Sequence, residues 1–151
     1  MDFSFDTTTQ ALISRARRFV DEHVLPAEPV LEQQLAATPD EWTVRPIVRD
    51  LQQRARAEGL WNLFLPAGHG DNGGAGLTNL QYAPVAEITG WSTRLAPPAF
   101  NCAAPDTGNM EVLNDFGTPE QKATWLRPLL DAEIRSAFCM TELNSASSDA
   151  R

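Results

Sequence analysis

Prolines and glycines divide this sequence into short segments, and most of the segments carry apolar residues at helical spacing. The first segment shows the pattern most clearly, with an apolar stripe made by Leu12, Ile13, Ala16, Phe19, Val20 and Val24. Either Asp6 or Thr7 can cap this helix, and the spacing of Thr7 and Gln10 fits a capping box. Pro26 ends or kinks the segment, because proline lacks an N–H donor and clashes with the preceding turn. The sequence therefore predicts a chain of short helices.

Start and stop signals of the same kind mark the next stretch. Thr38 and Pro39 combine a capping hydroxyl with a proline at the first helical position, and Pro46 repeats the proline signal. The helix that begins at Pro46 should end at Gly59, which can adopt the left-handed conformation common at helix ends. The apolar run over residues 60–66 is too bulky for the surface, so we expect it to fill the space between helices.

Further helix signals follow in the second half of the chain. Thr78 starts a helix that contains Pro84, so we expect either a kink or a late start of the helix. Another helix should cover residues 106–116, with Gly117 as its stop. Thr118-Pro119-Glu120-Gln121 then combines a cap, a first-position proline and a capping-box glutamine. Together these signals predict five or six helices.

A short apolar run over residues 137–141 favours a buried strand over a helix, because it is short and flanked by turn-forming residues. Cys139 within this strand is predicted to be an inert, packed thiol. The loop that follows offers hydroxyls and backbone N–H groups that can hold the polar edge of a cofactor, at Asn144, Ser145, Ser147 and Ser148. A plain surface turn is the more common meaning of such a loop, so the residues alone leave both interpretations open.

The net charge of −8 at pH 7 argues against nucleic acid as a partner, because a phosphate backbone would repel an acidic surface. With 151 residues the chain is long enough for one ordinary domain with a core. No apolar run approaches the length of a membrane span, and the acidic start lacks the cationic and apolar parts of a leader. We therefore predict a cytoplasmic location.

Other residues with chemical potential lack partners at useful spacing. Cys102 and Cys139 are too few for a disulfide framework, and neither His23 nor His69 has acids or cysteines at metal-ligand spacing. Residues 68–73 match G-x-G-x-x-G, but no strand leads into them, so tight turns between helices explain them better than a dinucleotide site. The core is expected to include the tryptophans Trp61, Trp91 and Trp125.

The last residues of the sequence resemble a flavin-binding signature. Met140-Thr141-Glu142, followed by Ser147-Ser148-Asp149-Ala150, is similar to the signature of the acyl-CoA dehydrogenase family, with Leu143 in place of the family's proline. Other stretches resemble the same family in the same order, namely residues 59–66, 100–102, 104–111, 116–118 and 125–126. Within the family, the pattern looks closest to the bacterial and peroxisomal or mitochondrial long-chain branch.

This resemblance implies a fold. A family member begins with an all-helical domain, continues with a β-domain and ends with a helical bundle, and the resemblance covers only its amino-terminal part. Residues 1–133 are thus expected to form the N-terminal helical domain. Residues 134–151 are expected to start the middle β-domain, with its first strand and the flavin loop. The fold class is mainly α.

The resemblance also implies an activity and its ligands. Family members use FAD to oxidise the bond between the α and β carbons of an acyl-CoA thioester, and an electron-transferring flavoprotein is their usual electron acceptor. The expected flavin contacts are Phe138, Met140, Thr141, Ser147 and Ser148. The expected substrate contacts are Ser148, near the thioester, and Thr107 and Met110, in a helix that would border the acyl tail.

The family's catalytic glutamate belongs to the carboxy-terminal bundle, so no residue here is assigned as the base. The chain alone is therefore expected to be inactive, and the full-length protein is expected to form a homo-oligomer. The alternative is a stand-alone helical binding module that derives from the same family and docks a partner on the face that the β-domain would cover. The uncharged edge at residues 137–140 favours the enzyme interpretation, because a stand-alone module would need to protect that edge. A helical scaffold without a flavin-binding history would leave the signature unexplained.

Overall fold

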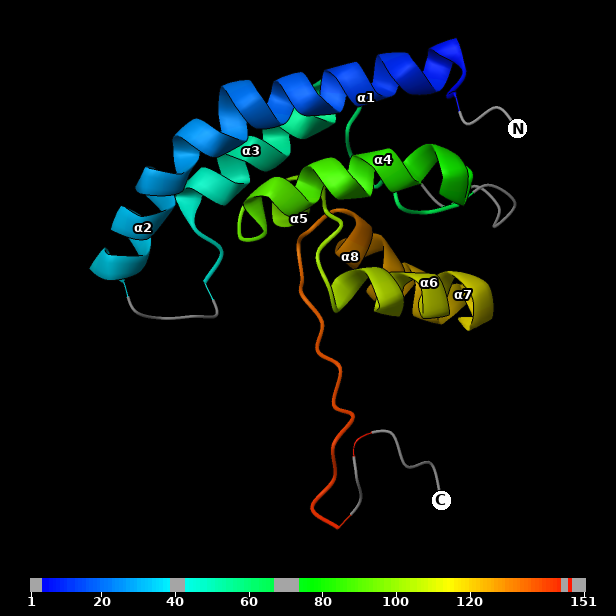
Figure 1. Cartoon of the computed structure of the whole chain (residues 1–151). Helices are drawn as coiled ribbons and strands as arrows, with labels where there is room; N and C mark the ends of the chain where they lie inside the picture. Colours follow the sequence, from blue (N-terminus) through cyan, green and yellow to red (C-terminus); the bar gives the residue numbers. More distant parts are fainter. Residues whose placement is uncertain (1–3, 39–42, 67–73, 145–146, 148–151) are drawn as a thin grey trace. The chain divides into compact units, whose positions relative to one another are not determined.

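The computed structural model describes residues 4–38, 43–66, 74–144 and 147 of the chain (Figure 1). The chain divides into two compact units, residues 1–103 and residues 104–151. Both units are helical in their described parts, and no strand is assigned there. The prediction of a mainly helical chain is confirmed.

One long helical path opens the first unit. α1 (Thr7–Phe19) continues through a π turn (Val20–Val24) and a 3-10 turn (Leu25–Ala27) into α2 (Glu28–Ala37). Figure 1 shows these elements in blue as one curved rod. Pro26 lies in the 3-10 turn, so the predicted interruption of the α-helix near this proline is confirmed.

Asp6 caps the start of α1. The backbone N–H of Thr9 donates to Asp6 Oδ1 at 2.7 Å, and this hydrogen bond lowers the pKa of the Asp6 carboxyl. The Gln10 side chain donates to the carbonyl oxygen of Phe5 at 2.8 Å instead of closing a box with Thr7. The predicted capping box at Thr7 is therefore wrong, because Asp6 lies one residue earlier and is the better capping residue.

α3 (Pro46–Ala57) begins at its proline and ends before Gly59, whose φ of +66° lies in the left-handed region, as predicted. The apolar run that follows is buried, with exposed fractions of at most 7% for Leu60, Leu63, Phe64 and Leu65. Asn62 and Asn101 both have a positive φ, and the side-chain amide of Asn101 donates to Asn62 Oδ1 at 2.7 Å. This bond joins two buried corners of the chain.

α4 (Asn79–Thr89) starts with a capping box. Gln81 N donates to Thr78 Oγ1 at 3.3 Å, and Thr78 N donates to Gln81 Oε1 at 2.9 Å. The helix contains Pro84 and continues past it. The unit ends with two short elements, a 3-10 turn (Gly90–Ser92) and α5 (Ala96–Ala99).

The core of the first unit draws buried side chains from all of its α-helices. α1 packs on α4, and α3 packs on α5. The ring of Phe19 meets the ring of Phe100 edge to face, with 5.3 Å between centroids and an interplanar angle of 90°. Both rings are at most 1% exposed, so this contact lies at the centre of the unit's packing.

The second unit contains α6 (Asp106–Phe116), α7 (Pro119–Gln121), a π turn (Lys122–Leu126) and α8 (Arg127–Leu130). Gln121 N donates to Thr118 Oγ1 at 3.3 Å, and Thr118 N donates to Gln121 Oε1 at 2.9 Å. The capping box predicted at this helix start is therefore confirmed. The small core of the unit is made by Met110, Leu126, Leu129 and Leu130.

Residues 135–141, which we call the signature segment, leave α8 as an extended chain (Figure 1). The buried strand predicted at residues 137–141 is not formed here, because a strand needs a neighbour to pair with and no described residue pairs with this segment. Phe138 and Met140 are 65% and 53% exposed. Cys139 is exposed as well, so the prediction of a packed thiol is wrong for this chain.

Two tryptophans predicted to be core are exposed, Trp91 to 44% and Trp125 to 55%. The guanidinium carbon of Arg17 lies 5.2 Å from the centroid of a Trp91 ring, so this indole forms a cation–π contact at the surface of the unit. Trp61 packs against the core, as predicted, and the Arg56 guanidinium covers its ring at 3.8 Å from the centroid.

Two predicted features lie outside the described residues, the helix start at Pro39 and the glycine turns over residues 68–73. The kink expected at Pro84 also stays a prediction. In the parts of the chain that the structure describes, no helix has both the length and the apolar character that crossing a membrane requires.

A glycine pair in the second unit yields a stability prediction. A Cβ on Gly117 would lie 2.4 Å from the carbonyl oxygen of Leu113, whereas a Cβ on Gly108 would meet nothing within 4 Å. We expect Gly117→Ala to lower the free energy of unfolding by about 1–3 kcal/mol, because the backbone must shift to relieve the overlap. We expect Gly108→Ala to raise it by about 0.5–1 kcal/mol, because alanine favours a helix interior. Urea unfolding of both variants tests the pair, and a Gly117→Ala variant as stable as the parent would contradict the first expectation.

The two cysteines should react at different rates with a maleimide. Burial raises the pKa of the Cys102 thiol, so little of it is thiolate near pH 8. Cys139 is exposed on the signature segment. We expect Cys139 to be labelled first, which mass spectrometry of the native protein would detect, with Cys139→Ser and Cys102→Ser as matched controls. Faster labelling of Cys102 would contradict this placement.

Candidate functional site

An apolar hollow of about 390 Å³ lies in the second unit, beside α6 and the start of the signature segment. The hollow is open to solvent, and nearly all of its surface is apolar. Its lining consists of Ala104, Pro105, Thr107, Gly108, Asn109, Val112 and Phe138. Val112 is 58% exposed and Phe138 is 65% exposed, so both leave apolar surface available to a ligand.

The hollow unites two of the predicted site residues that are far apart in the sequence. Thr107, an expected substrate contact, comes from the first turn of α6. Phe138, an expected flavin contact, comes from the signature segment. Met110 does not line the hollow, because its side chain is fully buried in the core of the unit.

The other predicted cofactor contacts follow Phe138 along the chain. Met140 and Thr141 belong to the exposed end of the signature segment, and Ser147 is exposed too. Ser148 lies outside the described residues.

A polar cluster that sequence reasoning missed joins the start of α6 to the signature segment. Asp106 is 3% exposed, and its Oδ1 accepts hydrogen bonds from Ser136 N at 2.8 Å and from Ser136 Oγ at 2.6 Å. Asp106 Oδ2 forms an ion pair with Nε of Arg135. Asn109, one turn along α6, donates to Ser136 Oγ at 2.8 Å. No local signal in the sequence could have found this cluster, because Arg135 and Ser136 lie 29 and 30 positions after Asp106.

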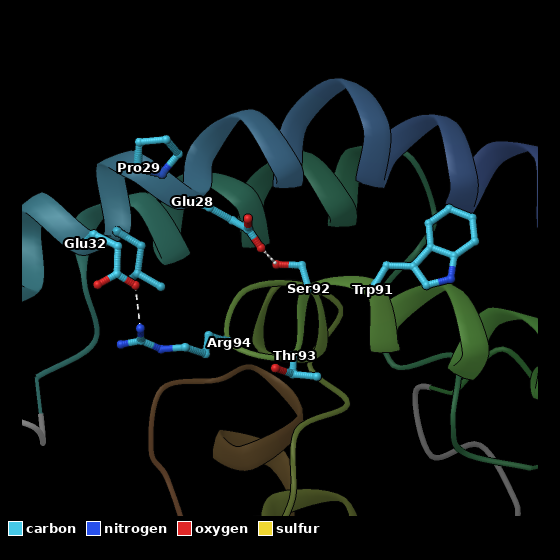
Figure 2. Close-up of a pocket in the computed structure, with 8 residues that line it drawn as sticks. Glu28, Pro29, Glu32, Trp91, Ser92, Thr93 and Arg94 are labelled. Carbon is cyan, nitrogen blue, oxygen red and sulfur yellow. Dashed lines mark hydrogen bonds and ion pairs between the residues drawn. The ribbon is translucent and has the colours of Figure 1, made fainter.

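A second hollow, of about 420 Å³, lies in the first unit between α2 and the 3-10 turn that follows α4 (Figure 2). Four of its polar side chains form two pairs. Ser92 Oγ donates to Glu28 Oε1 at 2.8 Å, and Arg94 forms an ion pair with Glu32. That ion pair is about 60% exposed at both ends, so it contributes at most about 1 kcal/mol. None of the residues predicted for the site lines this hollow.

The described residues include no group of three or more His, Cys, Asp or Glu side chains that could hold a metal ion. Of the two hollows, the one beside α6 is the better candidate for a ligand site, because it combines apolar surface with two of the predicted contact residues.

Comparisons with known proteins point to one family. A family model described as the acyl-CoA dehydrogenase N-terminal domain matches residues 6–133. A relative from Mycobacterium tuberculosis, named probable acyl-CoA dehydrogenase FadE2, is 53% identical over 152 residues, which cover 100% of this chain and 36% of the relative. Human acyl-CoA dehydrogenase family member 11 is 46% identical over 144 residues, which cover 93% of this chain and 18% of that protein.

A solved structure agrees with the sequence comparisons. An acyl-CoA dehydrogenase-like protein from Mycobacterium abscessus superposes with a TM-score of 0.85 at 47% identity, covering 97% of this chain and 37% of that chain. The chain thus spans little more than a third of the length of its mycobacterial relatives. It belongs to the acyl-CoA dehydrogenase family and corresponds to the N-terminal domain of the family's members.

Proposed function

We propose that this chain is the N-terminal part of an FAD-dependent acyl-CoA dehydrogenase that oxidises the α,β bond of an acyl-CoA thioester. The observation that carries the proposal is the shared hollow, in which Phe138 of the flavin signature and Thr107 of α6 line one apolar surface. Membership of the family supports the reaction class. The proposed activity is that of a whole family member. The match covers only 36% of the relative from Mycobacterium tuberculosis, so most of such a protein lies outside the matched part.

The signature segment has the chemistry that a flat ring with a polar edge requires. Phe138 and Met140 offer apolar side chains that are more than half exposed, and the Thr141 hydroxyl offers a donor and an acceptor beside them. The backbone of residues 137–141 belongs to no helix or strand. FAD, when bound, would supply the acceptor for the hydride that leaves the β carbon. Ser147 and Ser148 would extend the polar contacts along the loop.

The hollow beside α6 suits the acyl part of the substrate. An acyl tail is apolar, and the hollow presents almost only apolar surface. Gly108 and Val112 lie one helical turn apart on α6 and line the hollow together with Thr107 and Asn109 of the same helix. Met110 would support this surface from the core behind it.

Among the described residues, the lining of the hollow beside α6 offers no base for the proton on the α carbon. None of the residues that line the described hollow is acidic. The Asp106 carboxylate is buried and bonded to Arg135 and Ser136, so it is not available to accept a substrate proton. The base is therefore proposed to come from the rest of the protein, and residues 1–151 alone are proposed to bind ligand without turning it over.

The remaining assignments belong to the same proposal. Residues 1–133 would form the helical domain, and residues 134–151 would begin a middle β-domain; the end of the family match at residue 133 supports this boundary. An electron-transferring flavoprotein would take the electrons, the full-length protein would be a homo-oligomer, and its location would be the cytoplasm.

Replacing Thr141 tests the flavin assignment in the purified, full-length gene product. Thr141→Val keeps the shape of the side chain and removes its hydroxyl. A net hydrogen bond contributes about 0.5–1.5 kcal/mol, so we expect FAD to bind about 2–10 times more weakly. Fluorescence titration of FAD and the absorption spectrum of the bound flavin measure the effect.

Thr107→Val is the matched control, because it removes the same group from the α6 lining of the hollow. It should leave flavin affinity unchanged. Unchanged flavin affinity and spectrum in Thr141→Val would contradict the assignment. Absence of acyl-CoA oxidation by the flavin-loaded gene product would contradict the proposed activity and favour a helical binding module instead.

A further inference from the structure

We propose that Asp106 is a positioning residue. Through Arg135 and Ser136 it holds the signature segment against α6 and thereby sets where Phe138 and Thr141 meet their ligand. The contacts of Asp106 with Arg135 and Ser136 are observed within the second unit and do not depend on the proposed function. Their effect on flavin and substrate rests on the proposed function.

The carboxylate of Asp106 is bonded at both oxygens. Oδ1 accepts from the backbone N–H of Ser136 at 2.8 Å and from its hydroxyl at 2.6 Å, while Oδ2 pairs with Nε of Arg135. Two consecutive residues of the segment are therefore held by one side chain of α6. A backbone bond restrains the course of the chain itself, which a contact between side chains alone would not do.

Asn109 adds a second attachment on the next turn of α6. Its side-chain amide donates to Ser136 Oγ at 2.8 Å and to the carbonyl oxygen of Ala137 at 3.3 Å. Residues three positions apart lie on the same face of a helix, so Asp106 and Asn109 both bond to the segment from one face of α6. The Ser136 hydroxyl accepts from Asn109 and donates to Asp106, which fixes its orientation.

Burial separates this ion pair from an ordinary surface pair. The Asp106 side chain is 5% exposed and the Arg135 side chain is 45% exposed. In the Asp50–Arg54 pair, both side chains are about half exposed. Loss of the partners of a buried carboxylate leaves a charge that water cannot reach, so the protein is strongly driven to keep the Asp106 contacts.

The attachment lies close enough to the site to control it. Phe138 is the second residue after Ser136, and each residue of an extended chain spans at most about 3.3–3.6 Å. Phe138 must therefore stay near α6, where it completes the hollow with Val112. A displacement of about 1 Å in a positioned group can reduce a rate about 100-fold, so a loose segment would impair the reaction without removing any reacting group.

Hydrogen exchange tests the attachment in the chain as it stands. In Asp106→Asn the new amide places a donor where Arg135 needs an acceptor, while the other oxygen can still accept from Ser136. Loss of the ion pair loosens the segment around the bond from Ser136 N to Asp106 Oδ1, so we expect the Ser136 amide to exchange at least tenfold faster than in the parent. Ser136→Ala removes only the hydroxyl and keeps the backbone N–H, so it should give a smaller increase. It also provides a folded variant for comparison if Asp106→Asn fails to fold. Asp50→Asn is the matched control and should leave this segment unchanged.

Two readouts on the flavin-loaded gene product separate positioning from folding. Asp106→Asn should shift the absorption band of the bound flavin and lower kcat at least tenfold, whereas Ser136→Ala, which leaves the carboxylate and its ion pair in place, should change both readouts in the same direction by less. The effects of Asp106→Asn and Ser136→Ala should be non-additive, because both act through one contact.

Each outcome decides a separate claim. Unchanged exchange in Asp106→Asn would overturn the attachment. Faster exchange with an unchanged flavin spectrum and unchanged kcat would overturn the positioning role. If the parent protein binds neither flavin nor acyl-CoA, the proposed function fails, whereas the exchange result still decides whether Asp106 holds the segment.

Discussion

A buried carboxylate at the start of α6 organises the second unit of this chain. Asp106 accepts hydrogen bonds from Ser136 and pairs with Arg135, which follows it by 29 positions, so one side chain ties the start of α6 to the chain that follows α8. Nearly complete burial makes these bonds strong, because water does not compete for the carboxylate. The helices between the two ends pack around Met110, and the hollow lies beside this contact. The first unit instead depends on apolar packing, with Phe19 and Phe100 at its centre.

Helix starts were predictable from the sequence because the bonds that define them are local. The boxes at Thr78 and Thr118 each join residues three positions apart, and the left-handed turn at Gly59 depends on one residue's own sterics. The error at Thr7 shows the limit of local reasoning, since two neighbouring residues could cap the same helix and Asp6 does so. The resemblance of the whole chain to one family correctly gave the fold class and the family.

Contacts between distant residues could not be read from local signals. Nothing near Asp106 in the sequence indicates that its partners lie at residues 135 and 136. The strand expected at residues 137–141 needs hydrogen bonds from a neighbouring strand, and those bonds cannot come from within the segment. Trp91 was expected inside because it is large and apolar, yet Arg17 stacks on it at the surface. In the candidate site, Thr107 and Phe138 were predicted from the resemblance to the family. That both line one hollow became visible only in the structure.

Some residues of α6 are buried in the core and others line the hollow, and this difference determines which positions can change in size. Met110 is fully buried, so a change in its size would disturb the packing that keeps the unit folded. Gly108 and Val112 face the hollow on the same helix, and a Cβ on Gly108 would meet open space. Side chains at these two positions can therefore grow or shrink with little effect on folding. The helix thus separates residues that maintain the scaffold from residues whose size can change, so the shape of the hollow can change while the fold persists.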